Sequence, residues 1–338
     1  MKIGFLLPTT FAVGSPFNGI REQAIYQASA VGSLGHEVVL MSPWEKYDLE
    51  SFDVFHFFQG GPAFHKIEKN VMATKFKLVF APIIDSMTPN WLYRISDRIG
   101  RIHSKIDTVQ SYFSEQAANS DLVIARSTYE RNKLIYGLGI NPSKIHIVLN
   151  GFPKSGSVDA QVARNEFSIN EDFILHISKF TNTNKNVLNM IKAIGPLGFP
   201  LIIAGTSSPG VYLDEIMEEA SKYTSIRILG RLSDEMRDSL YAACKVFCLP
   251  SHQEGTGLVA VEAASYGANI VITSNGGPPD YFKDYAEYVC DASVDAIKSA
   301  VSRAFNKDRS PELKNHVLEN LTWEQSAKQL ERLYSLTN

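Results

Sequence analysis

Short apolar runs alternate with stretches of helical periodicity along most of this 338-residue chain. The opening shows the pattern: an apolar run at 3–7, a loop rich in turn residues at 8–19, helical periodicity over 20–34 and a second apolar run at 37–41. Strand, helix and strand in this order form a βαβ unit, whose strands are parallel and whose crossover is right-handed. The alternation therefore predicts α/β domains built on doubly wound parallel sheets.

The alternation runs in two series. Predicted strands of the first series occupy 3–7, 37–41, 53–57, 77–82, 121–125 and 145–149, and those of the second occupy 173–177, 201–204, 226–229, 246–249, 270–273 and 288–290, with helices near 186–195, 211–222 and 233–243. Residues 153–170, between the two series, are polar and contain Gly, Ser and Asp, as a linker does. Because the chain exceeds the usual size of one domain, we expect domains at 1–152 and 153–322, followed by an amphipathic helix within 323–338.

Composition excludes several classes of protein. The net charge of −3 and the pI near 6.3 give no general attraction to nucleic acid. No run approaches the roughly 20 apolar residues that span a bilayer, and the first apolar run is too short for a signal peptide. Cys244, Cys248 and Cys290 are few, odd in number and set in apolar surroundings, which fits neither a disulfide framework nor a metal site. We expect a reduced, cytoplasmic protein.

The stretch at 246–267, VFCLPSHQEGTGLVAVEAASYG, carries the clearest functional pattern. Its apolar run at 246–249 is a predicted buried strand, Gly255 and Gly257 lie in the following loop, and helical spacing begins at Leu258. A strand, a glycine-containing loop and a helix present backbone N–H groups and a helix N-terminus to an anion. We therefore expect residues 255–258, which include Thr256, to contact phosphate.

Two glutamates bracket this turn. Glu254 lies in the loop and Glu262 lies one to two turns into the helix. Because bound phosphate repels a carboxylate, each glutamate is better suited to the hydroxyls of a sugar or a ribose. The simpler alternative is that Glu254 caps the helix and Glu262 is a solvated helix residue.

The letters E-G-T-G-L…E-A…G, with glutamates eight positions apart, resemble the EX7E signature of retaining GT-B glycosyltransferases of family 4. The next segment, VITSNGGPPDYF, resembles the following strand and Gly-Gly loop of that family, although the family more often has Glu at the position of Asp280. The resemblance implies two Rossmann-like domains facing a cleft, with the C-terminal helix crossing back to the N-terminal domain. It also implies that Glu254 orients the donor sugar and that Glu262 binds the ribose.

Lys179 and Lys185 lie six positions apart in HISKFTNTNKN, after the strand that opens the second series. The family usually has Arg and Lys at this spacing, where they bind the donor diphosphate, so the resemblance implies that role here. Lys179 stands in the Arg position and supplies a point charge without the bidentate fork of a guanidinium. The alternative is a pair of solvated surface lysines.

Three further positions match loops that approach a ligand in the family. Gly19 ends the first loop, where the family often has a pair of glycines. Gly205 and Arg231 follow predicted strands of the second series, and the resemblance places them near the nucleotide. Plain strand-to-helix turns explain the last two equally well.

Two residues of the first series, Asp85 and His56, follow or lie within predicted strands. Many family members have a histidine just past the fourth strand, whereas this chain has Asp85, which we expect to accept hydrogen bonds from sugar hydroxyls. His56 lies in an apolar run, and we expect it to be a core residue.

The segment at 91–106, WLYRISDRIGRIHSKI, repeats isoleucine on one face and Arg or Lys on the adjoining stripe. One interpretation is a basic rim that attracts an anionic acceptor or a lipid headgroup surface. The other is an ordinary amphipathic helix that packs its isoleucines on a sheet and solvates its cationic face.

Taken together, the resemblance implies a retaining transferase that moves a sugar from a nucleotide diphosphate, UDP or GDP, to a hydroxyl of a glycan or lipid-linked acceptor. The chain has no DxD-type metal motif, so we expect no metal requirement, and a lipid-linked acceptor would bring a peripheral contact with the cytoplasmic membrane face. Two alternatives stay open: a nucleotide-sugar 2-epimerase, which needs acid/base residues in another motif context, and a non-catalytic partner subunit with the same fold.

Overall fold

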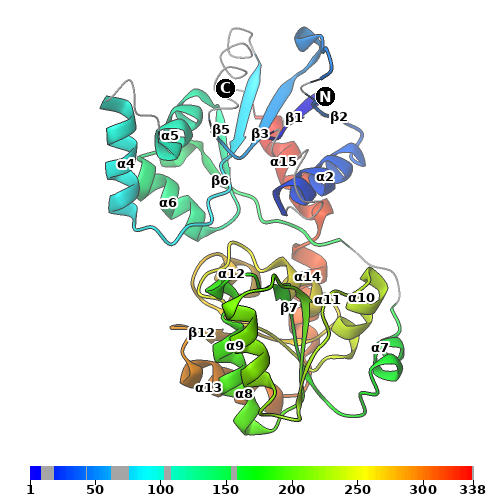
Figure 1. The fold of residues 1–338 in the computed structure, drawn as a ribbon. Helices are drawn as coiled ribbons and strands as arrows, with labels where there is room; N and C mark the ends of the chain where they lie inside the picture. Colours follow the sequence, from blue (N-terminus) through cyan, green and yellow to red (C-terminus); the bar gives the residue numbers. More distant parts are fainter. Residues whose placement is uncertain (9–18, 43, 62–75, 103–107, 154–157, 337–338) are drawn as a thin grey trace. The chain divides into compact units, whose positions relative to one another are not determined.

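The computed structural model describes residues 1–8, 19–42, 44–61, 76–102, 108–153 and 158–336. They form two compact units: unit 1 comprises Met1–Gly151 and Trp323–Asn338, and unit 2 comprises Phe152–Thr322. Each unit contains a parallel sheet of six strands covered by helices on both faces (Figure 1). The prediction of two doubly wound α/β domains is confirmed.

Unit 1 has the strand order β2-β1-β3-β4-β5-β6, and every neighbouring pair is parallel. The strands are β1 (Lys2–Leu6), β2 (Glu37–Leu40), β3 (Val54–Phe58), β4 (Lys77–Ala81), β5 (Leu122–Ala125) and β6 (Ile145–Ile147). Strands β3, β4 and β5 are mostly apolar and, apart from Lys77, buried on both faces, as expected for a parallel sheet that helices cover on both sides.

Two groups of helices cover this sheet. Helices α4 (Asn90–Ile102), α5 (Val109–Asn119) and α6 (Thr128–Leu138) lie on one side, and α2 (Gly19–Gly32) and α15 (Trp323–Tyr334) lie on the other (Figure 1). Each side has its own apolar cluster. Short 3-10 turns occur at Leu49–Ser51 and Pro142–Lys144.

The C-terminal helix α15 completes the core of unit 1, as the resemblance implied. Ala327 and Leu330 are fully buried beside α2, and the ring of Trp323 stacks on that of Tyr26 with centroids 5.7 Å apart. The Tyr334 hydroxyl lies 2.7 Å from Nδ1 of His56. His56 is a core residue, as predicted, and burial lowers its pKa to about 3.

Unit 2 has the strand order β12-β11-β10-β7-β8-β9, again with parallel neighbours throughout. The strands are β7 (Ile174–Lys179), β8 (Leu201–Thr206), β9 (Ile226–Ile228), β10 (Val246–Leu249), β11 (Asn269–Thr273) and β12 (Glu287–Val289). The chain builds outward from β7 to β9 on one side and then starts again at β10 on the other. The order therefore reverses between β7 and β10, which is the Rossmann switch point where such sheets bind ligands.

The helices of unit 2 connect these strands. They are α7 (Ala160–Glu166), α8 (Val187–Ile194), α9 (Val211–Ala220), α10 (Asp234–Ala243), α11 (Leu258–Ser265), α12 (Pro278–Phe282), α13 (Val294–Asn306) and α14 (Pro311–Asn320), with 3-10 turns at Thr183–Lys185, Gly195–Leu197 and Lys283–Tyr285.

Helix α7 corrects the prediction of a linker at 153–170. Asp159 caps the helix by accepting a hydrogen bond from the Gln161 N–H. Ala163 is fully buried, and its N–H donates to Ser239 Oγ at 2.9 Å, so the segment packs on α10. The segment has a polar composition because a helix of seven residues buries few of them, here only Ala163. Polar composition alone therefore does not distinguish this helix from a linker.

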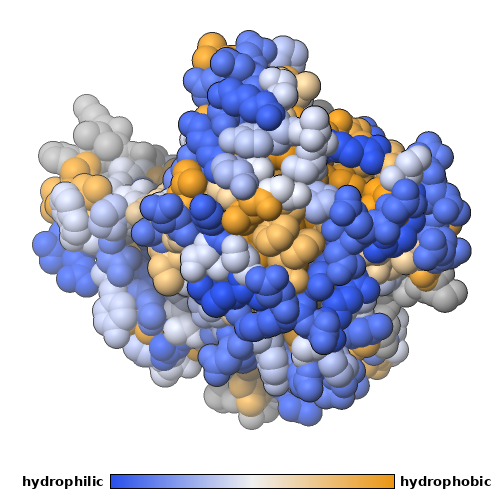
Figure 2. Space-filling model, turned by 90° about the horizontal axis from the view of Figure 1, so that it is seen from below, coloured by the Kyte–Doolittle hydropathy of each residue, from blue (hydrophilic) through white to orange (hydrophobic). Residues whose placement is uncertain are grey.

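Seen from below the view of Figure 1, the surface is mostly hydrophilic, and hydrophobic residues gather there in small groups (Figure 2). Within the described residues, no helix combines the length and the hydropathy needed to cross a bilayer.

Candidate active site

Two loops meet at the switch point of unit 2. Strand β7 ends at Lys179 and strand β10 ends at Leu249, and the two strands are hydrogen-bonded neighbours. Parallel strands end at the same edge of a sheet, so the segments after β7 and β10 emerge side by side. These segments contain Lys185 and Glu254, two of the predicted site residues.

Asn186 connects the two loops through hydrogen bonds of its side chain. It is buried and has the left-handed backbone conformation, with φ +56°. Its side-chain amide donates to the carbonyl oxygens of Pro250, at 3.1 Å, and Ala292, at 2.7 Å. The His252 N–H also donates to the Asn184 carbonyl at 2.8 Å. Asparagine suits this position because it tolerates φ > 0 and its amide satisfies buried carbonyls.

Lys185 and Glu254 form an ion pair at the meeting of the loops. Lys185 Nζ lies 2.5 Å from Glu254 Oε1, and the Ser251 hydroxyl donates to the same oxygen at 2.6 Å. Glu254 is buried, whereas Lys185 is partly exposed. A buried carboxylate needs such partners because its desolvation is costly. The pair therefore holds a negative and a positive group at one fixed place, with the ammonium accessible from solvent.

The backbone of Glu254 forms two hydrogen bonds with the turn after β11. The Glu254 N–H donates to the Asn275 carbonyl at 3.1 Å, and the Gly277 N–H donates to the Glu254 carbonyl at 3.0 Å. Between them Gly276 has φ +119°, and a Cβ at this position would overlap the Glu254 carbonyl oxygen. Only glycine permits both the conformation and the close approach.

Gly257 begins the helix that follows. It has φ +77°, and a Cβ on it would lie 2.7 Å from Ile272 Cδ1. Its carbonyl accepts hydrogen bonds from the N–H groups of Ala260 and Val261, so α11 starts at Leu258. The turn formed by Gly255, Thr256, Gly257 and Leu258 thus leads into a helix N-terminus, which is the arrangement that the sequence predicted.

Two buried polar groups in this loop lack partners within the described residues. They are the hydroxyl of Thr256 and the amide nitrogen of Gln253. Buried side-chain donors are nearly always hydrogen-bonded in folded proteins. The two groups mark this loop as one whose polar side chains are not all satisfied by the described part of the protein itself.

Glu262 lies half-buried on α11, next to two residues of the neighbouring helix α10. Burial alone would lower the pKa of Arg237, but the charges of Glu262 and Asp238 outweigh it and raise that pKa. Burial raises the pKa of Tyr241 far above its usual value, and Glu262 adds to the effect. Arg237 also donates to Asp238 and Asp234. Glu262 is therefore a charged group in a polar cluster rather than a solvated helix residue.

The other predicted residues of unit 2 lie at neighbouring strand ends. Lys179 is the exposed last residue of β7, paired in register with Thr206 of β8. Gly205 has φ +128°, and a Cβ there would overlap the Ser178 carbonyl oxygen, so close packing of β7 on β8 already explains this glycine. Arg231 is exposed in the turn after β9.

His176 lies beneath the switch point and was not singled out from the sequence. It is fully buried in β7, with Nδ1 2.7 Å from the Cys248 carbonyl oxygen and Nε2 2.7 Å from Ser178 Oγ. Since a carbonyl can only accept, Nδ1 carries the proton. Burial, helped by the nearby Lys185 charge, lowers the pKa of His176 to about 4. The neutral ring thus links β7 to β10 below the ion pair.

The remaining predicted residues belong to unit 1. Gly19 is the first residue of α2, and residues 9–18 of the loop before it lie outside the described residues. Asp85 follows β4, and its carboxylate receives Nη2 of Arg126 at 2.8 Å. Arg126 is buried and also donates through Nε to Glu130, at 3.1 Å, whose other oxygen accepts the Ile84 N–H at 2.6 Å. Asp85 is therefore held by a guanidinium while its side chain stays 53% exposed.

The residues that the sequence analysis missed share one property. Asn186, His176, Arg126 and Arg237 act through partners that lie far from them in the sequence. The only local signal was the position of Asn186 directly after Lys185. His176 and Arg237 sit in ordinary strand and helix patterns, and Arg126 lies in the turn between β5 and α6.

Comparison with known proteins gives a family match for unit 2. Residues 158–321, nearly all of unit 2, match the family described as Glycosyl transferases group 1.

Individual relatives are distant. An uncharacterized glycosyltransferase of Methanocaldococcus jannaschii is 24% identical over 245 residues, which cover 69% of this chain and 60% of the relative. The O-antigen chain mannosyltransferase B of Escherichia coli is 32% identical over 111 residues, covering 32% of this chain and 29% of the relative. The chain thus spans less than two thirds of the length of these relatives.

Solved structures match over nearly the whole chain. The Anabaena protein HepE in complex with UDP aligns with a TM-score of 0.75 at 18% identity, covering 99% of this chain and 100% of that one. Sucrose-phosphate synthase of Thermosynechococcus elongatus aligns with a TM-score of 0.75 at 16% identity, covering 98% of each chain. The chain therefore has the GT-B fold, and residues 158–321 of its second unit are similar to the glycosyl transferases group 1 family.

Proposed function

We propose that this protein is a retaining glycosyltransferase of the family 4 type. It would transfer a sugar from a nucleoside-diphosphate sugar to a hydroxyl group of a glycan or a lipid-linked acceptor. The observation that carries the proposal is the Lys185–Glu254 ion pair at the switch point of unit 2, in a segment that matches a glycosyltransferase family.

The positive groups of this site suit the departing nucleoside diphosphate. An ammonium has three donor hydrogens, so Lys185 can keep its bond to Glu254 and still donate to a phosphate oxygen. Lys179 and the N-terminus of α11 add positive charge and dipole at the same edge of the sheet. These groups would stabilise the phosphate charge that grows as the bond to the sugar breaks, and we propose that no metal ion is required.

The carboxylates suit the hydroxyl-bearing parts of the donor. Glu254 is fixed by Lys185, Ser251 and two backbone hydrogen bonds, so it can accept from a sugar hydroxyl without reorganising. Glu262 lies in the cluster with Arg237 and would accept from the ribose. Asp85, held by Arg126, is proposed to accept from hydroxyls of the substrate.

The chemistry needs no protein base. The bond between the anomeric carbon and the phosphate oxygen breaks, and the acceptor oxygen bonds to the same face of that carbon. The acceptor proton passes to an oxygen of the departing phosphate. We therefore assign no residue as the general base.

Names of related proteins support a role in surface polysaccharide or glycoconjugate synthesis. One relative is an O-antigen chain mannosyltransferase, and another is an uncharacterized protein of the cps region of Klebsiella pneumoniae, 25% identical over 225 residues. HepE structures with UDP and with UDP-glucose support a uridine diphosphate donor. A lipid-linked acceptor would bring the protein to the cytoplasmic membrane face as a peripheral protein.

The first experiment is a thermal-shift screen of the whole protein against UDP, GDP, ADP and their sugar conjugates, with and without EDTA. A ligand that binds the native state raises the melting temperature by mass action. We expect one nucleotide family to raise it equally in both buffers. Release of the nucleoside diphosphate is then measured with a panel of acceptor sugars and lipid-linked sugars.

The outcomes separate the three functions considered. Acceptor-dependent release of the nucleoside diphosphate supports transfer. Conversion of the donor into its epimer would identify an isomerase, and donor binding without turnover for any acceptor would indicate a non-catalytic subunit. A shift that EDTA abolishes would contradict the metal-free site.

A further inference from the structure

Helix α4 of unit 1 turns an apolar side outward. Only Tyr93 and Asp97 of its thirteen residues are buried. Five large apolar residues of the helix are exposed, namely Trp91 (61%), Leu92 (39%), Ile95 (47%), Ile99 (42%) and Ile102 (74%). Single exposed apolar residues are common on proteins, but a contiguous group marks an interaction site. This corrects the interpretation in which the isoleucines pack on the sheet.

The exposed apolar residues form one stripe. With about 3.6 residues per turn, positions 91, 95, 99 and 102 fall on the same side of a helix, and position 92 borders it. Arg94, Arg98 and Arg101 repeat at the same spacings on the adjoining stripe. The helix therefore carries an apolar stripe and a cationic stripe next to each other.

The packed side of α4 is a third stripe. The Ser96 hydroxyl donates to Gln110 at 2.9 Å, and the Ser114 hydroxyl donates to Asp97, so these positions face α5. Gly100 also contacts α5, since a Cβ on it would overlap Ser111. This stripe lies opposite the apolar one, which accordingly points away from the body of unit 1.

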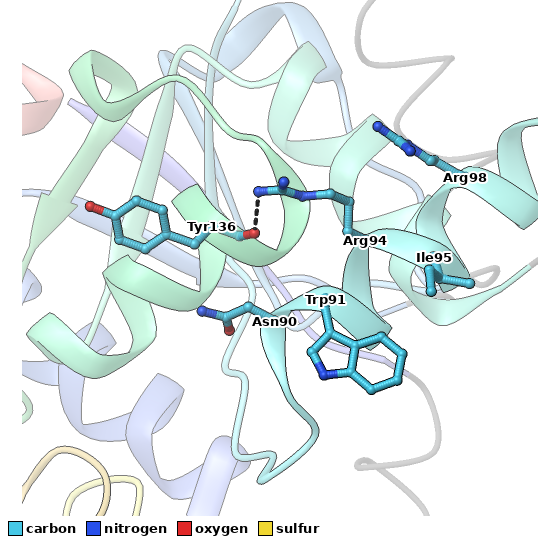
Figure 3. Close-up of a pocket in the computed structure, with 6 residues that line it drawn as sticks. All are labelled: Asn90, Trp91, Arg94, Ile95, Arg98 and Tyr136. Carbon is cyan, nitrogen blue, oxygen red and sulfur yellow. Dashed lines mark hydrogen bonds between the residues drawn. The ribbon is translucent and has the colours of Figure 1, made fainter.

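A shallow depression of about 510 Å³ lies where the apolar and cationic stripes meet. Its walls come from Asn90, Trp91, Arg94, Ile95 and Arg98 of α4 and from Tyr136 of α6 (Figure 3). Arg94 Nη2 donates to the Tyr136 carbonyl at 2.7 Å, which fixes its guanidinium at the rim. Arg98 is exposed beside it.

We propose that α4 docks this protein on an anionic lipid bilayer, lying in the plane of the interface. Trp91, Ile95, Ile99 and Ile102 would enter the boundary between headgroups and acyl chains, and Arg94 and Arg98 would contact lipid phosphates. A helix with Arg on one face and Trp and Ile on the next has the composition of interfacial helices. The depression between Trp91 and Arg98 would hold a headgroup phosphate.

The charge pattern selects this occupant. Arg101 is paired with Asp97 at 3.0 Å, which leaves Arg94 and Arg98 as the cations beside the apolar stripe. They attract a surface with many negative charges, and an anionic bilayer supplies both that surface and an apolar layer beneath it. A second copy of this chain would bring the same two cations to the contact. The docking also differs from the proposed transfer reaction because it uses neither the donor site nor any residue of unit 2.

The test is co-sedimentation of the whole protein with vesicles, without donor or acceptor. Vesicles of phosphatidylcholine alone are compared with vesicles containing 30% phosphatidylglycerol, at low and high salt. The variants are Ile95→Gln with Ile99→Gln, and Arg94→Gln with Arg98→Gln. The matched controls are Val211→Gln with Met217→Gln, which are exposed apolar residues of α9, and Lys298→Gln with Lys328→Gln, which are exposed cations elsewhere.

We expect binding to the anionic vesicles only, weakening as salt rises. Each basic residue near such a surface contributes about fivefold in affinity, so the arginine pair should lower the partition coefficient by about 25-fold. The isoleucine pair should lower it at least tenfold, and both control pairs should leave it unchanged. Fluorescence of Trp91, taken as the difference between wild type and Trp91→Phe, should shift to the blue and be quenched by brominated lipid.

Three results would overturn the proposal. The first is that the wild type does not sediment with anionic vesicles. The second is that the control pairs lower the partition coefficient as much as the α4 pairs do. The third is that both α4 variants bind vesicles as the wild type does. If the α4 variants instead turned a dimer into a monomer in light scattering and left vesicle binding intact, α4 would be a subunit interface. A failure here would leave the transferase assay untouched, because that assay uses soluble acceptors as well.

Discussion

Lys185 and Glu254 are 69 positions apart in the sequence, yet their charged groups lie 2.5 Å apart at the edge of the second sheet. Each enters from the strand end next to the other's, and Asn186 and Asn275 hold the two loops in place. The pair couples the group that would bind phosphate to the group that would bind sugar. Changing either residue should therefore affect both ends of the donor.

Lys185→Ala should reduce the rate of transfer by more than tenfold. Loss of one charge-assisted contact to phosphate costs about 1.5–3 kcal/mol, and Glu254 also loses its ionic partner. The measurement is kcat/KM for the donor, with Lys192→Ala as the control because Lys192 is an exposed lysine of the next helix. A wild-type rate in Lys185→Ala would rule out the diphosphate role.

Glu262→Ala should weaken binding of the free nucleotide without changing the preference among donor sugars. The reason is that Glu262 sits with Arg237 on the α10 side of α11, whereas Glu254 occupies the turn before α11. Calorimetry with the nucleoside diphosphate measures the effect, and Glu235→Ala on the exposed side of α10 is the control. Equal affinities for wild type and Glu262→Ala would exclude the ribose contact.

Asp85 and Glu130 bind the same guanidinium but should respond differently to removal. Glu130→Ala should lower the free energy of unfolding by about 3–5 kcal/mol, because it leaves the buried Arg126 without its buried partner. Asp85→Ala should cost less than about 1 kcal/mol, since its side chain is 53% exposed. Urea unfolding compares the two. If Asp85 contacts substrate, its variant loses activity while keeping stability.

Gly276→Ala should destabilise unit 2 by about 2–4 kcal/mol and lower donor binding with it. The added Cβ would overlap the Glu254 carbonyl, and φ of +119° disfavours any side chain. Gly32→Ala is the control, because a Cβ there meets nothing within 4 Å and the change should stay within about 1 kcal/mol. Scanning calorimetry with and without the nucleotide reports both effects. Indistinguishable melting curves for the wild type and Gly276→Ala would refute the close approach.

Acid should destabilise unit 2 through His176. Its pKa is near 6.5 when unfolded and is lowered to about 4 in the fold, so the unfolded state binds the proton first. The stability that the neutral ring contributes is complete above pH 6.5 and is lost as the pH falls toward 4, in total about 3 kcal/mol. Between pH 6.5 and 4.5, the free energy of unfolding should fall less steeply with pH in His176→Asn than in the wild type. Parallel plots would show that the pKa of His176 is the same in the folded and unfolded states.

Much of this arrangement could be predicted from local pattern. Strand β10 has the predicted bounds, and the turn from Gly255 to Leu258 leads into a helix as expected, because apolar runs and glycines act over short distances. The order of the strands could not be predicted, since it depends on which edges pair. For the same reason the partners of Glu262 and Asp85 were missed: Arg237 and Arg126 lie on other elements.

Helix α4 shows a second limit of prediction from the sequence. Its periodicity identified an apolar stripe and a basic stripe, but periodicity does not say which stripe meets the protein. The contacts of Ser96, Asp97 and Gly100 with α5 show which side of the helix packs on unit 1. Nothing in the sequence distinguishes these three residues.

The division of the chain has a consequence for synthesis. Unit 1 needs α15, yet α15 is translated after all of unit 2. While the ribosome makes residues 152–322, the apolar surface that Ala327, Leu330 and Tyr334 later cover stays open. Unit 2 is continuous in sequence and can fold as it emerges, so the domain that begins first is the one completed last, reversing the usual N-to-C order.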